Sequence, residues 1–250
     1  MSQKPILPNT ILCAIVRDEM TNPAGGIESF LDAHLPHFEQ AVIVDTGSTD
    51  GTLQYLQKRQ EKERKLKLLA HSFTGFDTAR NTYLEEVRRR FSGEVGVLSL
   101  DADELLTTEE AQNLSEIVIQ GVDPEVLALK MQVLDVDSLG KVSPCRKTYR
   151  ARMLFLNKIT AVGNLPELVY HGKVGELPYA RIEGVKGANL EFDTFVTKPA
   201  GINILQFLPP AEALVAKRKQ RYQEGIYIPQ PEKQGLPDWK RPNPFRAKYQ

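Results

Sequence analysis

Cysteine is scarce in this chain, and its scarcity excludes several kinds of site. The only two cysteines are Cys13 and Cys145, and neither belongs to a C-x-x-C pair or to a cysteine–histidine ligand spacing. This pattern argues against a structural zinc module and suits a protein of a reducing compartment. Cys13 falls inside an apolar run, where a free thiol behaves as a small hydrophobic side chain.

An excess of charge and a long apolar segment are also missing. The 250 residues include 32 basic and 32 acidic side chains, so the formal net charge is zero and no overall field favours nucleic acid. No apolar stretch approaches the roughly 18 residues that a membrane-spanning helix needs. Met1–Thr10 lacks the basic and apolar segments of a signal peptide. Together these absences predict a cytoplasmic protein.

Charged side chains stand at the ends of short apolar runs. Apolar residues at 11–16, 41–44 and 95–100 predict buried strands, and helical periodicity at 27–38, 51–63 and 76–87 predicts an alternating chain with a parallel sheet. The runs lead into Arg17, Asp18 and Glu19, into Asp45, and into Asp101 and Asp103. Because the carboxyl ends of parallel strands share one edge, we expect these groups to converge there.

Two of these strand ends carry a recognisable chemistry. Asp101 and Asp103 have one residue between them, a spacing that lets two carboxylates share a hard divalent cation with substrate phosphates. The alternative is that they begin a solvated turn before a helix that starts near Thr107. Asp45 leads into the small polar loop 46–52, whose hydroxyl and N–H groups at a helix start suit an anion or a nucleoside.

The second half of the chain no longer alternates strand and helix. Strands are predicted at 126–136 and 152–156, and a turn-rich stretch follows them. We predict one domain over residues 1–208, with halves at 8–122 and 123–208. A helix at 211–224 and a proline-rich basic tail then make up residues 209–250. The tail predicts peripheral contact with an anionic membrane at its inner face, against the alternative of a solvated helix and a strap packed on the domain.

Four segments, taken in order, carry a family resemblance. They are residues 11–19, VIVDTGSTDGT at 42–52, GFDTARN at 75–81 and LSLDADELL at 98–106. Together they resemble family 2 glycosyltransferases of the GT-A fold, and among these the small soluble branch related to lipopolysaccharide-core glucosyltransferases. The resemblance covers residues 8–115. It implies an α/β fold with a Rossmann-like, mostly parallel central sheet flanked by helices.

The resemblance also implies a reaction. It is a metal-dependent, inverting transfer of a sugar from a nucleotide-diphospho-sugar, UDP-linked, to a saccharide or glycolipid acceptor. A divalent cation, Mn²⁺ or Mg²⁺, would be held by Asp103 and by Asp101, which either shares the metal or touches the ribose. Arg80 would face the diphosphate or serve a structural ion pair. The nucleotide-binding residues implied by the resemblance are Arg17, Asp18, Glu19, Asp45, Arg80 and Asp101.

Glu167 is the general base implied by the resemblance. Related enzymes carry a His-Glu pair after an arginine-containing strand; Glu167 matches the Glu, but Pro166 stands where the His is expected. Glu183 and Asp193 are the alternatives. A second departure is the insertion 21–26 after the first strand, which either reshapes the nucleoside edge or acts as a lid. For the whole protein, the alternative is a non-catalytic module that binds nucleotide or glycan.

Overall fold

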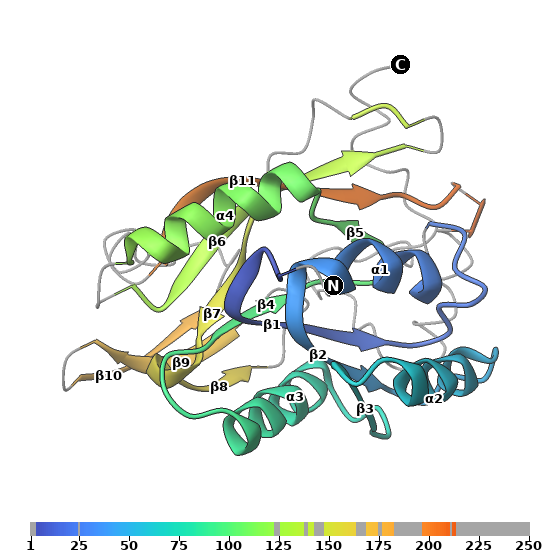
Figure 1. Ribbon diagram of the computed structural model, residues 1–250, viewed down its shortest axis with the longest axis horizontal. Coiled ribbons are helices and arrows are strands. Elements are labelled where there is room, and N and C mark those ends of the chain that lie inside the picture. The colour runs from blue at the N-terminus through green and yellow to red at the C-terminus, as the bar shows by residue number, and fades with distance from the viewer. Residues whose placement is uncertain are drawn as a thin grey trace, which may run out of the picture.

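A twisted eight-stranded sheet forms the centre of the computed structural model (Figure 1). The structure describes residues 4–24, 26–122, 126–137, 140–142, 148–163, 169–174, 177–182, 197–210 and 212–213. The strand order is β3-β2-β1-β4-β7-β6-β11-β5. The bounds are β1 Leu7–Val16, β2 Phe38–Asp45, β3 Leu66–Ala70, β4 Gly96–Ser99, β5 Glu104–Leu105, β6 Ala128–Val136, β7 Thr148–Phe155 and β11 Thr197–Phe207.

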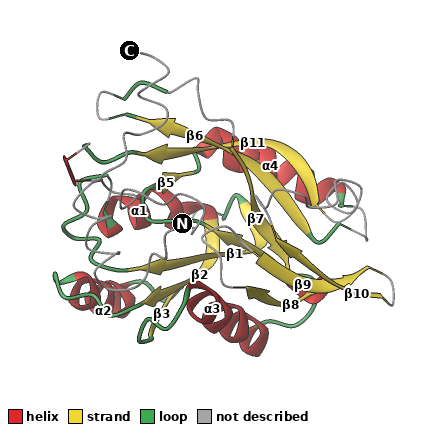
Figure 2. Ribbon diagram, turned by 180° about the vertical axis from the view of Figure 1, so that it is seen from behind, coloured by secondary structure: helices red, strands yellow, loops and turns green. Residues whose placement is uncertain are grey.

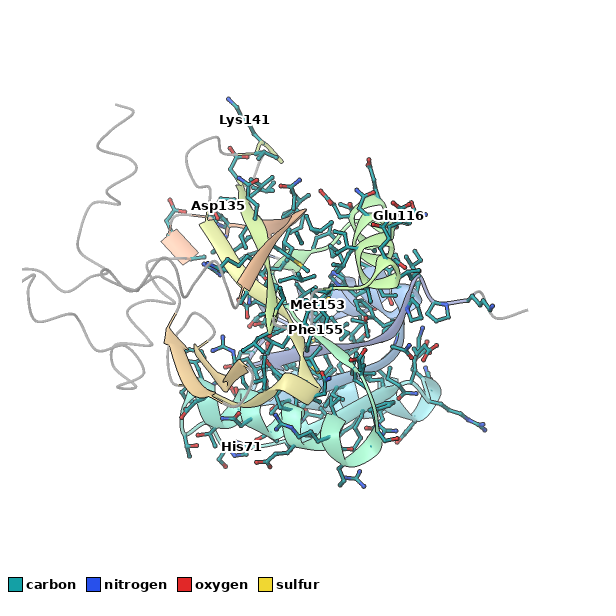
Figure 3. All side chains as sticks on the ribbon, turned by 90° about the vertical axis from the view of Figure 1, so that its left-hand side faces the viewer. His71, Glu116, Asp135, Lys141, Met153 and Phe155 are labelled. Carbon is teal, nitrogen blue, oxygen red and sulfur yellow. The ribbon has the colours of Figure 1, made fainter. Side chains whose placement is uncertain are left out.

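The predicted α/β class with a mostly parallel sheet is confirmed. Strands β3, β2, β1 and β4 are parallel neighbours, as are β6 and β11, whereas β7 runs antiparallel to both β4 and β6. Figure 3 shows Met153 and Phe155 of β7 inside the molecule, where β7 meets β4. The sheet therefore consists of a parallel first half and a mixed second half joined along β4 and β7.

Within the described residues, four helices cover the sheet and explain its continuous apolar strands. They are α1 Ile27–His34, α2 Thr52–Lys62, α3 Phe76–Arg90 and α4 Thr108–Gln120. Alternate residues of β1 enter two separate cores: Leu12 packs with the apolar faces of α1, α2 and α4, and Cys13 packs with that of α3. A strand covered on both faces has no solvent side, so it shows no polar alternation.

Two local features differ from what the sequence indicated. The helical pattern at 27–38 ends early: α1 stops at His34, a 3-10 turn spans Leu35–His37, and Phe38 already belongs to β2. Pro36 accounts for this because it has no N–H to donate to the carbonyl of Asp32, four residues earlier, so the α-helix cannot continue through it. The long strand β11 was not expected; it adds a parallel neighbour to β6.

Three further strands form a small antiparallel sheet beside α3 (Figure 2). They are β8 Ile159–Gly163, β9 Val169–Val174 and β10 Leu177–Ile182. Beyond Ala213, the predicted helix at 211–224 and the basic tail lie outside the described residues. Within the described part of the chain, no helix combines the length and apolarity required to cross a membrane.

Candidate active site

The carboxyl ends of the parallel strands meet at one edge of the sheet (Figure 1). The register pairs Val16 with Asp45, and Asp45 with Ala70. On the other side of β1, Cys13 pairs with Ser99, so the turn that follows β4 starts at the same edge. The expectation that these strand ends lie side by side is therefore confirmed. This edge is where open α/β sheets bind ligands.

Asp45 is buried at this edge with one carboxylate oxygen lacking a partner. Asp45 is only 1% exposed to solvent. The Oδ1 atom accepts hydrogen bonds from the backbone N–H groups of Gly47 and Ser48, both at 3.0 Å. Gly47 has φ 99°, a left-handed conformation that favours glycine and lets both amides reach Asp45. The Oδ2 atom is buried and has no hydrogen-bond partner.

The loop after β1 is hydrogen-bonded to the loop after β2. Asp18 has φ 56°, and its Oδ1 accepts from Thr49 N at 2.7 Å, while its own N–H donates to Ser48 Oγ at 2.9 Å. A non-glycine residue in this conformation is strained and persists only where its surroundings fix it. The two loops thus form one cross-bonded platform.

The insertion 21–26 is attached to this platform. Thr21 donates from both its N–H, at 2.9 Å, and its hydroxyl, at 3.0 Å, to Asp50 Oδ2. Thr52 Oγ1 accepts from the N–H of Glu19 at 2.8 Å and of Met20 at 3.0 Å. The start of the insertion is therefore anchored to the residues that precede and begin α2.

The other residues expected after β1 lie in the same platform. Arg17 Nε is 3.7 Å from Asp18 Oδ2, and both side chains are partly exposed. Glu19 is buried, and its Oε2 accepts from Asn22 Nδ2 at 2.6 Å. These contacts give the three residues structural roles at the sheet edge, next to Asp45.

A compact acidic turn connects β4 to β5. The N–H of Glu104 donates to the carbonyl of Asp101 at 2.9 Å, and the N–H of Asp101 donates back to Glu104 Oε2 at 3.1 Å. Strand β11 holds the turn from outside, because Phe207 N donates to the carbonyl of Asp103 at 2.8 Å. The acids therefore belong to a fixed turn, although the helix that follows does begin where expected, with Thr107 Oγ1 accepting from Glu110 N at 3.2 Å.

Guanidinium groups surround the acidic turn. Arg152 of β7 binds Asp101 Oδ2 at 3.1 Å and also bonds Glu104, and Arg150 Nη1 lies 3.7 Å from Glu104 Oε1. Arg80 of α3 is buried, with its guanidinium carbon 5.5 Å above the centroid of the Phe76 ring. The structure thus brings Arg80 from α3 and two arginines from β7 into the electrostatic environment of Asp101.

These charges shift the pKa values of Asp101 and Glu104 in opposite directions. Burial alone would raise the pKa of Asp101, but attraction to Arg152, Arg80 and Arg150 outweighs it and lowers this pKa to about 2. Burial raises the pKa of Glu104 to about 7, against the attraction of Arg152 and with the help of repulsion from Asp101 and Asp103. Asp101 is therefore ionised at neutral pH, and 36% of its side chain is exposed.

The donor set of the turn fits a hard divalent cation. Asp101 and Asp103 offer carboxylate oxygens, and Mg²⁺-like ions are often held by one or two carboxylates plus substrate phosphates and waters. Among the described residues, no group of three or more acidic, histidine or cysteine side chains gathers to form a complete metal cage. The remaining ligands would therefore come from the diphosphate or from water.

Three groups at this edge were not predicted. Glu104 and Arg152 form an ion pair between residues 48 apart in sequence, which no local motif signals. His71 follows β3, donates its N–H to the carbonyl of Asp45 at 2.9 Å, and has a buried ring Nδ1 without a partner; Figure 3 labels it. Glu167, Pro166 and the alternative bases Glu183 and Asp193 lie outside the described residues.

The site thus combines a parallel sheet edge, a buried carboxylate oxygen without a partner and an acidic turn, at the place where α/β proteins bind ligands. Comparison with known families makes this specific. The chain belongs to glycosyl transferase family 2, whose model matches residues 25–161, and the predicted family is therefore confirmed. No curated protein matches the sequence.

Several solved glycosyltransferases are distantly similar to this chain. The mannosyltransferase PcManGT from Pyrobaculum calidifontis, in complex with GDP-Man and Mn²⁺, is 18% identical over 90% of this chain and 66% of its own, with a TM-score of 0.49. TarS 1–349 from S. aureus is 21% identical over 58% and 46%, with a TM-score of 0.40. GalNAc-T7 with UDP, GalNAc and Mn²⁺ is 10% identical over 80% and 44%, with a TM-score of 0.43. The chain spans 66% or less of these structures.

Proposed function

We propose that this protein is a metal-dependent, inverting glycosyltransferase that uses a UDP-linked sugar as its donor. The observation that carries the proposal is Asp45 Oδ2, a buried acceptor without a partner at the ligand edge of the sheet. An ionised carboxylate accepts hydrogen bonds only, so this atom calls for an N–H or O–H donor from a ligand. Burying such an atom unpaired costs stability, and a ligand that pairs it recovers that cost.

The free acceptor atom favours uracil among the nucleobases. Asp45 Oδ1 is taken by two backbone amides, which leaves one acceptor for the base. Uracil presents a single N3–H, whereas the corresponding edge of guanine presents both N1–H and an amino group. His71 Nδ1 adds a second polar atom at the neighbouring strand end. In the tautomer that carries the proton on Nδ1, this atom would donate a hydrogen bond to a uracil carbonyl. Arg17, Asp18 and Glu19 complete the nucleoside edge in this proposal.

The acidic turn would receive the diphosphate. Asp103 and Asp101 would hold Mn²⁺ or Mg²⁺, which would neutralise charge that develops on the leaving nucleoside diphosphate. Arg80, buried on α3 and electrostatically coupled to Asp101, would donate charge-assisted hydrogen bonds to a phosphate oxygen. Asp101, ionised and partly exposed, could also accept from a ribose hydroxyl.

The second half of the proposed 1–208 domain, residues 123–208, would bind the acceptor, a saccharide or glycolipid. Inverting transfer needs a base that removes the proton of the acceptor hydroxyl on the face opposite the leaving group. We assign this role to Glu167, with Glu183 and Asp193 as the alternatives. A cytoplasmic location, with the basic tail resting on an anionic membrane, would bring the enzyme to a lipid-linked acceptor.

A thermal-shift panel followed by a turnover assay tests the proposal. UDP, GDP and UDP-sugars are each added with and without Mn²⁺. We expect UDP with Mn²⁺ to raise the melting temperature more than GDP does; a ligand at about 100 times its Kd adds about 2.7 kcal/mol of stability. Slow hydrolysis of one UDP-sugar would support an enzyme. Binding of UDP with no sugar release and no transfer would support a non-catalytic module, and no stabilisation by any nucleotide would refute the proposal.

A further inference from the structure

Arg152 is placed at the acidic turn by an irregularity in its strand. Strand β6 pairs Leu129 with Met153 and Lys130 with Ala151, so Arg152 is the extra residue of a β-bulge in β7. Bulges leave one residue out of the ladder and re-aim its side chain, and they are enriched near active sites. On the opposite side of β7, Leu98 pairs with Met153, which brings Arg152 next to the end of β4 where the acidic turn begins.

The side chain of Arg152 holds both ends of the turn. Its Nη2 atom donates to Asp101 Oδ2 at 3.1 Å and to Glu104 Oε1. Glu104 in turn accepts from the backbone N–H of Asp101 at 3.1 Å, so the three residues form a closed hydrogen-bonded set. The side chain of Arg152 is 2% exposed and that of Glu104 is 0% exposed, which means that solvent does not compete for the contact between these two residues.

A contribution to the stability of the fold does not by itself explain this arrangement. A buried ion pair is often no more stabilising than apolar side chains of similar volume, because both charges must be desolvated. The pair Arg152–Glu104 could therefore be replaced by a neutral pair at little cost. The bond to Asp101 is different, since it fixes the orientation of a carboxylate that remains partly exposed at the ligand edge.

We propose that Arg152 is a positioning residue for the metal–diphosphate subsite, acting through Asp101 and Glu104 from the bulge of β7. The inference rests on the proposed function, because it needs Asp101 and Asp103 to receive the cation. Arg152 itself does not contact the donor. It sets the direction in which Asp101 presents its carboxylate, in the way that hydrogen-bonded partners of metal ligands do in other proteins.

The test separates positioning from stability with paired substitutions. Arg152→Met leaves Glu104 as an uncompensated buried charge and is expected to destabilise the protein strongly. The double variant Arg152→Met with Glu104→Gln removes both charges and is expected to regain most of the melting temperature. Arg88→Met is the matched control, because Arg88 binds the carbonyl of Ile159 and lies away from the acidic turn.

The readout is the Kd of UDP measured by calorimetry with and without Mn²⁺, together with the melting temperature. We expect Mn²⁺ to tighten UDP binding to the wild type and to Arg88→Met. In the double variant, UDP binding without metal should be unchanged, since Asp45 is untouched, and the gain from Mn²⁺ should fall by about 10-fold to 100-fold. Arg152→Lys retains the charge, but its amine ends one bond short of the position of Nη2, the atom that bonds both carboxylates, so the gain from Mn²⁺ should also fall.

The possible failures are distinguishable. A wild type that binds no UDP, or gains nothing from Mn²⁺, would overturn the proposed function and this inference with it. A wild type that responds to Mn²⁺ and a double variant that responds equally would overturn the inference alone, because Arg152 would then be merely structural. If neither methionine variant folds, Arg152→Lys decides: a full response to Mn²⁺ overturns the inference, and a reduced response with an unchanged metal-free Kd supports it.

Discussion

The substitution Asp45→Asn tests the proposed role of Asp45 in nucleoside binding without disturbing the fold. In the variant, the amide oxygen can still accept the two backbone N–H groups of Gly47 and Ser48 that bind Oδ1 in the wild type. The amide NH₂ takes the place of Oδ2, the atom that has no protein partner. The free energy of unfolding should therefore stay the same or rise, since a buried charge is removed and no existing hydrogen bond is lost.

The loss in binding can be worked from the same geometry. A hydrogen bond to a charged group contributes about 1.5–3 kcal/mol. Replacing the acceptor Oδ2 with the NH₂ group of asparagine removes that bond. It also places two donors, this NH₂ group and the N3–H of uracil, opposite each other. The Kd of UDP should therefore rise by about 10-fold to 150-fold, since each 1.4 kcal/mol corresponds to about a factor of ten.

Calorimetric titration of UDP and thermal melting of the same samples measure both effects. Asp32→Asn is the control, because Asp32 pairs with Arg59 at 2.7 Å on the surface and its loss changes the net charge equally. The control should keep the affinity of the wild type for UDP. An Asp45→Asn variant that binds UDP as tightly as the wild type would refute the assignment of Asp45 to the base.

Three further predictions concern other parts of the molecule. Asp103→Asn should lower the rate of sugar transfer by about a hundredfold or more in defined Mn²⁺ while the melting temperature is kept, because the metal contributes several kcal/mol to the transition state; near-normal transfer would remove Asp103 from the metal site. Burial lowers the pKa of His34 to about 4 in the folded protein. As the pH falls from 6.5 to 4, His34 therefore binds a proton in the unfolded chain before it does so in the folded protein. The free energy of unfolding should drop by about 3 kcal/mol across that window, and chemical denaturation of His34→Gln should show a smaller drop; an equal drop would exclude His34 as its source. Thr107→Ala removes the cap that accepts from Glu110 N and should cost about 1 kcal/mol of stability by urea denaturation, whereas an unchanged midpoint would show that the cap contributes nothing.

The parallel half of the fold could be predicted because its strands are buried on both faces. Continuous apolar runs locate β1, β2 and β4. Since parallel strands end at one edge, the convergence of the residues after β1, β2 and β4 followed directly. The mixed half was harder: β11 and β5 pair with strands distant in sequence, and a two-residue strand such as Glu104–Leu105 has no periodicity to detect.

The site residues also fall into two groups, those that a sequence pattern reveals and those that only the tertiary structure reveals. Asp45, Asp101 and Asp103 were visible because each follows an apolar run in the sequence. The partner of Asp101 was not, because Arg152 reaches it only through the register of β4 with β7 and the bulge between β7 and β6. His71 was missed for a different reason: its ring lies at the edge because β3 ends there, and a single histidine after a short strand carries no pattern.

The pairing of β4 with β7 has a consequence for how the chain folds. During synthesis, residues 1–122 emerge before Arg152, so the strands of the parallel half can associate while Glu104 still lacks its counter-charge. A carboxylate cannot be buried at low cost in that state. The acidic turn should therefore reach its native form only when β7 docks on β4, a late and non-local step of the kind that slows folding. A nascent chain halted before residue 152 would contain the cross-bonded loops after β1 and β2 but not the finished acidic turn.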